Sequence, residues 1–383
     1  YVQAAQAFFM DTEDGEQLRL ILVGDNRVLV FDEPWDSYRE YAIEEPWVIS
    51  NIVFARNGRF LAVCARKDSI VSYPELMHDA EFTKWTGFRI EITQDGFNLE
   101  RYESKPGNSE YMYYISNEGR VSASNGRGII SLLPQGDFNA FLSRSNEYTL
   151  WRRRACSYDS TIIAFGNDRK DDGIYLRGFD WSGSLLWETP TGDRNLTSLR
   201  ASPSGDYILA PARNGGVVCY SGEDGTKLWE TAEDLMCDYP QFSPSGERWI
   251  MSPDEVGHFY FFTGNLKTGY DHESITAYEI VSDYFQNPVC LNVNDSGNAL
   301  IWMQSSSNSH HLQLLYLDPE QNIVWAPEMI RFYEPRPAFN LSSPAWNAES
   351  YFYLTIAGIS HDGNRICYTD FNSIKVLRFE EVN

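Results

Sequence analysis

The chain has 383 residues, a formal net charge of −23 at pH 7 and an aromatic content of 15%. The negative charge argues against a nucleic-acid partner, because phosphate binding needs a basic surface. No apolar run approaches the roughly 18 residues that a membrane-spanning helix needs. The 27 glycines and 17 prolines supply many turns, so we expect a soluble, sheet-rich protein.

The first predicted sheet has strands at residues 7–16, 18–23, 27–31 and 38–43. Two tryptophans in and after it follow prolines, in Glu33-Pro34-Trp35 and Glu45-Pro46-Trp47. Trp35 and Trp47 either present their rings to a partner at a loop rim or fill gaps between sheets, and gap filling is the commoner role. We keep both as candidate partner-binding residues.

An insertion is predicted near residues 74–112. Within it, strands at 88–92 and 97–102 are joined by Thr93-Gln94-Asp95-Gly96, which indicates an extra or elongated hairpin. A third sheet follows from Tyr111 to about Ser143. The fourth opens with Trp151-Arg152-Arg153-Arg154, the one dense basic run in this acidic chain.

Residues 199–230 give the clearest prediction, with short strands at 199–202, 207–210, 217–220 and 226–229. The turns between them are rich in residues that suit tight turns, namely Ser202-Pro203-Ser204-Gly205, Asn214-Gly215-Gly216 and Gly222-Glu223-Asp224-Gly225. A single four-stranded sheet cannot bury both of its faces, so it needs neighbours of its own kind.

A second insertion is predicted near residues 325–353. Its alternate prolines, in Glu334-Pro335-Arg336-Pro337, cannot enter a strand ladder, so we expect a loop or an extended arm. Insertions on one face of a repeat protein are often its binding surface. Phe339 and Trp346 within it are therefore further candidate partner-binding residues.

The first turn of the 199–230 segment recurs along the chain. Its copies end at residues 15, 58, 119, 160, 205, 246, 297 and 363, in steps on or above the roughly 40–45 residues of a four-stranded propeller blade. The residue just before the turn is apolar in seven of the copies, and Asp11 takes this place in the first copy. The seven apolar residues of this column are Phe54, Ile115, Cys156, Ala201, Phe242, Val293 and Ile359. Packing one blade against the next requires such a column.

The predicted fold is therefore all-β, a closed β-propeller of four-stranded antiparallel blades, with eight blades favoured and seven the alternative. Residues 1–383 form one domain, because no linker or charge run divides them. The last copy, at 353–379, has only three strands. Residues 1–6 are expected to supply its fourth and to close the ring, since an open ring would leave two bare edges.

Two outer strands are near copies, Gly183-Ser184-Leu185-Leu186-Trp187-Glu188 and Gly225-Thr226-Lys227-Leu228-Trp229-Glu230, and Gln321-Asn322-Ile323-Val324-Trp325 is a third. In these elements the chain resembles the pyrroloquinoline-quinone-like repeat propellers, and its Ser-Pro-x-Gly turns resemble WD-repeat-like propellers. The resemblance implies the architecture and a tryptophan that stacks between blades. It carries no active site across, and the vicinal cysteine pair of the quinone dehydrogenases is absent.

No catalytic residue, metal site or cofactor is predicted. The chain has no G-x-S-x-G, H-E-x-x-H or G-x-x-x-x-G-K motif. His310 and His311 are adjacent, and neighbours in a strand point to opposite faces. The aspartates at 168, 171 and 172 do not have calcium-loop spacing. Whether the protein is an enzyme stays open, with a non-catalytic role favoured.

The six cysteines lie about one to a blade with no C-x-x-C pair, a pattern typical of small buried side chains rather than disulfides or zinc ligands. Free thiols favour the cytoplasm over the periplasm or the cell surface. The chain begins at Tyr1 and not at Met, so we expect a processed form or an excerpt. The sequence does not indicate an oligomeric state.

Two functions are compatible with these features. In the favoured one, the propeller is a platform for a protein or peptide partner, bound at insertions and rim aromatics. In the alternative, Trp151, Arg152 and Arg154 bind a small anion or a carbohydrate at the channel mouth, with or without chemistry, because first strands line the channel and guanidinium groups hold carboxylates or phosphates by forked hydrogen bonds.

Overall fold

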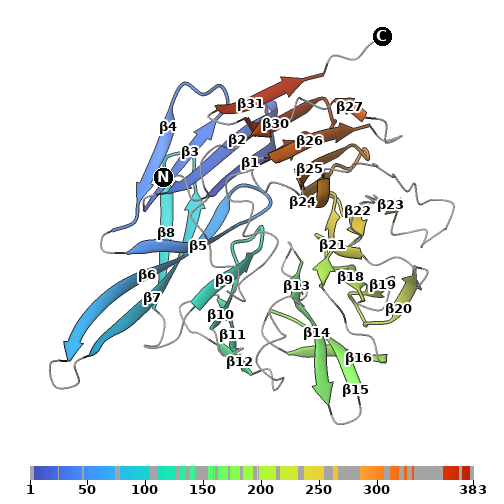
Figure 1. The fold of residues 1–383 in the computed structure, drawn as a ribbon, viewed down its shortest axis with the longest axis horizontal. Coiled ribbons are helices and arrows are strands. Elements are labelled where there is room, and N and C mark those ends of the chain that lie inside the picture. The colour runs from blue at the N-terminus through green and yellow to red at the C-terminus, as the bar shows by residue number, and fades with distance from the viewer. Residues whose placement is uncertain are drawn as a thin grey trace. The chain divides into compact units, whose positions relative to one another are not determined.

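The computed structural model describes most of the chain as strands and turns, and no helix occurs in the part that it describes (Figure 1). The described residues are 4–24, 26–44, 47–73, 78–103, 110–125, 129–133, 139–142, 154–157, 159, 163–170, 173–181, 184–192, 196, 198–212, 216–231, 237–253, 262–265, 285–305, 311–318, 323–325, 330–331, 357–370 and 373–379. No helix among them could cross a membrane.

Two compact units divide the chain. The first contains residues 1–147, 158–160 and 181–183, and the second contains residues 148–157, 161–180 and 184–383. Each is described by itself below.

The first unit contains three four-stranded antiparallel sheets, each of which joins strands that follow one another in the chain. The strands of the first sheet are β1 (Ala4–Thr12), β2 (Gly15–Gly24), β3 (Arg27–Asp32) and β4 (Tyr38–Ala42). Those of the second are β5 (Val48–Phe54), β6 (Phe60–Tyr73), β7 (His78–Ile92) and β8 (Phe97–Glu103), and those of the third are β9 (Glu110–Ile115), β10 (Val121–Asn125), β11 (Ile129–Leu133) and β12 (Asn139–Leu142).

The second unit contains five antiparallel sheets, which also join strands that follow one another in the chain, except that β28 pairs with β26. Two are four-stranded, with strands β13 (Arg154–Cys156), β14 (Ile163–Lys170), β15 (Gly173–Phe179) and β16 (Leu185–Gly192), and β17 (Arg200–Ala201), β18 (Tyr207–Pro211), β19 (Val217–Ser221) and β20 (Lys227–Glu230). The others are β21 (Cys237–Phe242), β22 (Arg248–Pro253) and β23 (Phe262–Asn265), then β24 (Phe285–Val293), β25 (Ala299–Ser305), β26 (His311–Leu317), β27 (Ile323–Trp325) and β28 (Ile330–Arg331), then β29 (Ala357–Ile359), β30 (Arg365–Asp370) and β31 (Ser373–Arg378).

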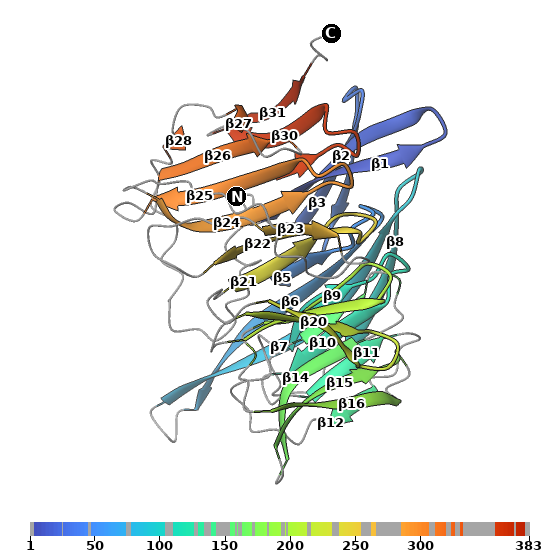
Figure 2. The ribbon, with the colours of Figure 1, turned by 90° about the vertical axis from the view of Figure 1, so that its right-hand side faces the viewer.

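The first strands of these five sheets contact one another in series, as blades of a propeller do. Figure 2 shows one of these sheets, with β24, β25 and β26 side by side. β13 contacts β17, β17 contacts β21, β21 contacts β24, and β24 contacts β29. The prediction for residues 199–230 is confirmed, because β17 to β20 fall within a few residues of the four expected strands.

Two predictions about the ends of elements are wrong. The first strand ends at Thr12 and not at Glu16, and the chain turns at residues 13–14, in agreement with the turn copy that ends at Gly15; this glycine takes a φ of 115° and starts β2. Residues 4–6 do not supply a fourth strand to β29–β31. They pair with β2, in the register Ala4↔Val23 to Gln6↔Ile21, because their backbone groups continue the ladder of the first sheet.

The recurring turn has one geometry in six of its copies. In each, the N–H of the closing glycine donates to the carbonyl oxygen of the first turn residue, over 2.9 to 3.1 Å. The φ angles of these glycines lie between 62 and 97°, a region that L side chains rarely adopt. The glycines are residues 58, 119, 205, 246, 297 and 363.

The serine that opens most of these turns caps the strand that follows. Ser202 and Ser360 are fully buried, and their hydroxyl oxygens accept the N–H groups of Tyr207 at 3.0 Å and Arg365 at 2.8 Å. Successive turns are also tied together, since the N–H of Ser245 donates to Asp295 at 2.9 Å. In these six copies the motif is therefore structural.

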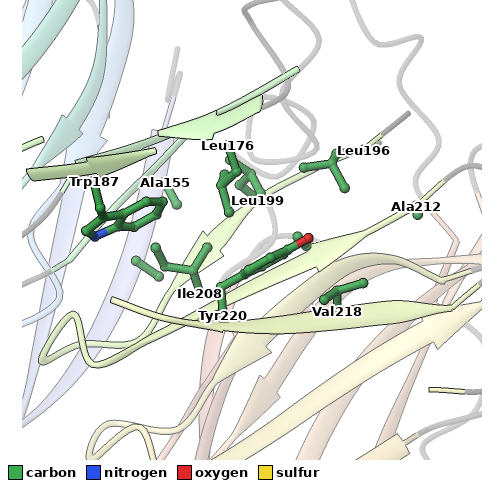
Figure 3. Close-up of a cluster of buried hydrophobic side chains, with 11 residues drawn as sticks. Ala155, Leu176, Trp187, Leu196, Leu199, Ile208, Ala212, Val218 and Tyr220 are labelled. Atoms are coloured by element: carbon green, nitrogen blue, oxygen red, sulfur yellow. The ribbon is translucent and has the colours of Figure 1, made fainter. Parts of the chain in front are cut away.

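Trp187 is the largest side chain of a core cluster between the β13–β16 and β17–β20 sheets (Figure 3). Its indole N–H donates to the carbonyl oxygen of Gly222 on the next sheet at 2.7 Å. A Cβ at Gly178 would lie 2.3 Å from the ring, and one at Gly225 would lie 2.4 Å from it. The tryptophan that the resemblance implies thus stacks between neighbouring blades, and glycines make room for it.

Three described cysteines behave as small core side chains. Cys64, Cys219 and Cys367 are fully buried and not in disulfides. Burial raises the pKa of the Cys367 thiol to about 12 and also raises the pKa of Cys219. We expect these three to resist iodoacetamide at pH 8 in the folded protein and to react in guanidinium chloride, which peptide mass spectrometry would measure. Rapid labelling of any of the three without denaturant would contradict their burial.

Candidate functional site

Most of the predicted ligand and partner residues fall outside the part of the chain that the structure describes. This holds for Trp151 and Arg152 of the anion-site prediction, and for Phe339 and Trp346 of the second insertion. Arg154 is the first residue of β13, but its side chain is not among those described. The anion site and the 325–353 insertion therefore stay predictions.

Trp47 lies immediately before β5 and is partly buried. The guanidinium carbon of Arg101 lies 5.2 Å from the centre of its ring, and the same group lies 5.9 Å from the ring centre of Phe88. This is a cation–π arrangement within the β5–β8 sheet. One side of the Trp47 ring is thus covered by the protein, which leaves Trp35 as the more accessible of the two.

Trp35 lies in the loop between β3 and β4 and is 39% exposed. Its φ of 72° is unusual for a large side chain, at a cost of roughly 1–2 kcal/mol. Its N–H donates to the carbonyl oxygen of Asp32 at 2.9 Å, which holds the turn. Tyr38, at the end of the same loop, is 57% exposed, and its ring centre lies 5.5 Å from that of Phe31. The loop and the first residue of β4 thus present two aromatic rings to solvent.

Asp32 anchors this loop through two arginines. Its carboxylate accepts the Nε–H of Arg19 at 2.6 Å and a guanidinium N–H of Arg39. Arg19 also donates to the carbonyl oxygen of Gly58 at 3.0 Å, and Arg39 to that of Thr93. Both carbonyl groups belong to turns of the second sheet, so the aromatic loop of the first sheet is attached to its neighbour at two points.

An open, acidic hollow of about 990 Å³ lies beside this loop. Its walls are the β1–β2 turn, the start of the β3–β4 loop and Gln94 of the β7–β8 turn. Five carboxylates line it, and no lysine or arginine is among its described lining residues: Asp11, Glu13, Asp14, Glu16 and Glu33. Glu33 also accepts the N–H of Leu18 at 3.2 Å. The hollow favours cationic groups, and salt would weaken that attraction.

A smaller cavity of about 310 Å³ lies in the second unit, between β16 and the β19–β20 hairpin. Its polar groups are engaged by the protein itself. The Thr189 hydroxyl donates to the carbonyl oxygen of Gly225 at 2.7 Å, and Lys227 pairs with Glu230 at 2.9 Å. Across the described part of the chain, no three His, Cys, Asp or Glu side chains converge as metal ligands would.

The sequence analysis missed Tyr38 and the acidic hollow. A signal for the hollow was present, because Asp11 is the one charged residue in the apolar column and starts the acidic run Asp11-Thr12-Glu13-Asp14-Gly15-Glu16.

No family model and no curated protein sequence matches this chain. Solved structures do match its fold. BamB from Moraxella catarrhalis is similar, with a TM-score of 0.54 and 12% identity over 99% of this chain and 99% of that one. A chain of a mitotic checkpoint complex aligns over 99% of this chain and 91% of its own, with a TM-score of 0.43 and 11% identity. At this identity the BamB likeness shows the fold alone, a β-propeller architecture of the kind that the repeats predicted.

Proposed function

We propose that this protein is a non-catalytic interaction platform, a single propeller of eight blades that binds a protein partner at the Trp35 loop. Three facts support the architecture. The described residues form eight antiparallel sheets, the turn motif recurs throughout the chain, and BamB has a similar fold. Seven blades would require one of the sheets to lie outside the ring.

The observation that carries the proposal is the pair of exposed rings of Trp35 and Tyr38 on an anchored loop. Exposed aromatic side chains are enriched among the residues that dominate binding energy at protein interfaces. A loop that is already held in one conformation loses less entropy on binding. The strain at Trp35 is also easier to understand if the ring position serves a partner.

The acidic hollow indicates the chemistry of that partner. A segment that places an apolar side chain against Trp35 would place its flanking residues near the five carboxylates. Lysine or arginine at those positions would be attracted, and acidic residues would be repelled. We therefore infer a partner segment that combines an apolar anchor with basic residues.

The test uses a phage-displayed library of random peptides selected on the full chain, with dissociation constants of the selected peptides measured by fluorescence anisotropy. We expect peptides that combine basic and apolar residues. We expect Trp35→Ala/Tyr38→Ala to bind them at least about 30-fold more weakly, the loss typical of an interface hot spot, and affinity to fall with salt.

Leu186→Ala/Leu228→Ala is the matched control, because these leucines of the second unit are 50% and 47% exposed. The control should bind the selected peptides as the wild type does. Equal binding by the aromatic double variant, or selection of mainly acidic peptides, would overturn the proposal. The alternative, anion or carbohydrate binding through Trp151, Arg152 and Arg154, rests on the sequence alone, and no described contact favours it.

A further inference from the structure

Three neighbouring first strands of the second unit carry a polar residue at the same place in the repeat. Arg200 lies on β17, Gln241 on β21 and Asn292 on β24, in each case two positions before the residue that opens the recurring turn. β17 contacts β21, and β21 contacts β24. The three polar residues therefore occupy equivalent positions on adjacent strands.

Each of these three side chains is partly exposed, although the residue that pairs with it on the second strand of the sheet is fully buried. Directly paired residues lie on the same face of a sheet, so the buried residues close that face on the side of the second strand. The exposed parts of the polar side chains therefore lie on the inner side of the first strands. The buried pairing residues are Leu209, Ile250 and Leu300, in chain order.

The neighbouring residues in the chain belong to the core. Ala201 is 6% exposed and packs in the cluster that joins its sheet to β13–β16, and Phe242 is 5% exposed and packs in the cluster that joins its sheet to β17–β20. Side chains alternate between the two faces of a strand. Arg200 and Gln241 therefore point away from those clusters.

The polar group is localised. The same place in the repeat is taken by Ala155 on β13 and by Gly358 on β29, and both are buried. Among the five first strands that the structure describes in the second unit, only the middle three thus carry a hydrogen-bonding side chain there. This is the arrangement of one site on adjacent strands and not of a continuous polar lining.

Contacts between turns hold the three strands in place. A Cβ at Gly246 would lie 2.9 Å from the ring of Pro203, so the β21–β22 turn packs closely on the β17–β18 turn. The hydroxyl of Ser245 donates to the carboxylate of Asp295 at 2.6 Å, which ties the β21–β22 turn to the β24–β25 turn. Groups whose strands are fixed before a ligand arrives bind it with a smaller loss of entropy.

The chemistry of the three side chains indicates the ligand. The guanidinium group of Arg200 suits a carboxylate, which it can hold by two parallel hydrogen bonds. The amides of Gln241 and Asn292 both donate and accept hydrogen bonds, and so does a hydroxyl group. The net charge of −23 disfavours ligands with several negative charges. A small molecule with one carboxylate and nearby hydroxyl groups satisfies all three conditions.

We propose that Arg200, Gln241 and Asn292 bind a small hydroxy acid or sugar acid on the inner side of the second unit. Arg200 holds the carboxylate, and the two amides hold hydroxyl groups. The site does not depend on the Trp35 loop, which belongs to the first unit, or on the basic run at residues 151–154.

The experiment measures binding to the full chain by isothermal titration calorimetry. The acids are glycolate, lactate, glycerate, gluconate and glucuronate, and the comparison compounds are acetate, glycerol, glucose and inorganic phosphate. We expect at least one acid to bind with a dissociation constant of about 1 mM or tighter, and at least about tenfold more tightly than every comparison compound. Hydrogen exchange of β17, β21 and β24 should slow when that acid binds.

The variants test the role of each side chain with the acid that binds most tightly. Arg200→Gln should weaken binding at least about tenfold, since a hydrogen bond to a charged group is lost, and Gln241→Ala and Asn292→Ala should each weaken it about fivefold. Arg200→Lys keeps the charge without the planar fork and should bind with an intermediate affinity.

Arg248→Gln is the matched control, because it makes the same change of charge at a partly exposed arginine on the second strand β22. It should bind the acid as the wild type does. Trp35→Ala/Tyr38→Ala should also bind the acid normally, which separates this result from the test of the proposed function.

Three results would overturn the proposal. One is that no acid of the panel reaches a dissociation constant of about 1 mM. Another is that phosphate or an uncharged compound binds as tightly as the best acid. The third is wild-type affinity in the Arg200→Gln variant, because the carboxylate would then lie elsewhere.

Discussion

Trp187→Ala is expected to lower the free energy of unfolding of the second unit by about 3–5 kcal/mol, the range for removing a large aromatic side chain from a core. Trp187 is only 7% exposed and fills the space between two sheets. Its removal leaves a cavity next to Gly178 and Gly225, whose missing side chains cannot fill it. The carbonyl oxygen of Gly222 also loses its indole donor.

Urea unfolding followed by hydrogen exchange at residues 173–192 and 217–230 would measure this loss in the two sheets concerned. Trp187→Phe keeps an aromatic ring but removes the N–H and part of the ring, so it should cost less than Trp187→Ala, namely the roughly 1 kcal/mol of one hydrogen bond plus a smaller cavity cost. Trp35→Ala is the exposed control and should change stability by no more than about 0.5 kcal/mol. A loss for Trp187→Ala as small as that of Trp35→Ala would show that Trp187 does not join the blades.

Gly225→Ala is expected to cost clearly more than Gly192→Ala, although the two glycines share nearly the same backbone conformation. Their φ angles are 72° and 68°, so alanine pays a similar left-handed penalty of roughly 1–2 kcal/mol at each. A Cβ at Gly192 meets no atom within 4 Å, whereas one at Gly225 would lie 2.4 Å from the Trp187 ring. Overpacking adds about 1–3 kcal/mol at Gly225 alone.

A double-mutant cycle isolates the ring contact. In a Trp187→Ala background the ring is absent, so the extra cost of Gly225→Ala should fall, and what remains should reflect the Thr189 hydroxyl, 2.7 Å from the added Cβ. Thermal unfolding of the five variants against the wild type would measure the cycle. An extra cost of Gly225→Ala that does not fall when the ring is removed would mean that the Trp187 ring is not what excludes a side chain there.

Individual sheets could be predicted best where the turn residues are distinctive. Strands β18 and β19 start at Tyr207 and Val217, as expected from the turns before them. The positive φ at the end of each turn could be predicted because glycine occupies that position in the sequence. The hydrogen bond from Tyr207 to the Ser202 hydroxyl could not, because it joins groups that only the closed turn brings together.

The insertion near residues 325–353 and the role of the basic run at residues 151–154 remain predictions. The prediction of an insertion near residues 74–112 was correct only in part. Strands at 88–92 and 97–102 do exist, but they complete the regular β5–β8 sheet instead of adding a hairpin to it. The added length lies in β6 and β7. Alternating apolar positions predict a strand but do not say how many strands will lie beside it.

The candidate site, like the fold, could be predicted from the sequence only in part. The sequence singled out Trp35 from its neighbouring proline but could not separate it from Trp47. That distinction depends on Arg101, which comes from a strand about 50 positions further along than Trp47 and packs its guanidinium group on the Trp47 ring. The acidic hollow likewise combines the β1–β2 turn with Glu33 and Gln94, which are far apart in sequence.

By itself, the sequence determined the repeat, the strand-and-turn composition of each blade and the glycines of its turns, because these follow from local backbone geometry and from the spacing of apolar residues. The tertiary structure alone decided which tryptophan is buried, where a ladder ends and which carboxylates face one hollow. Those properties depend on contacts between segments distant in the chain, and the energies that select them arise only when the sheets pack against one another.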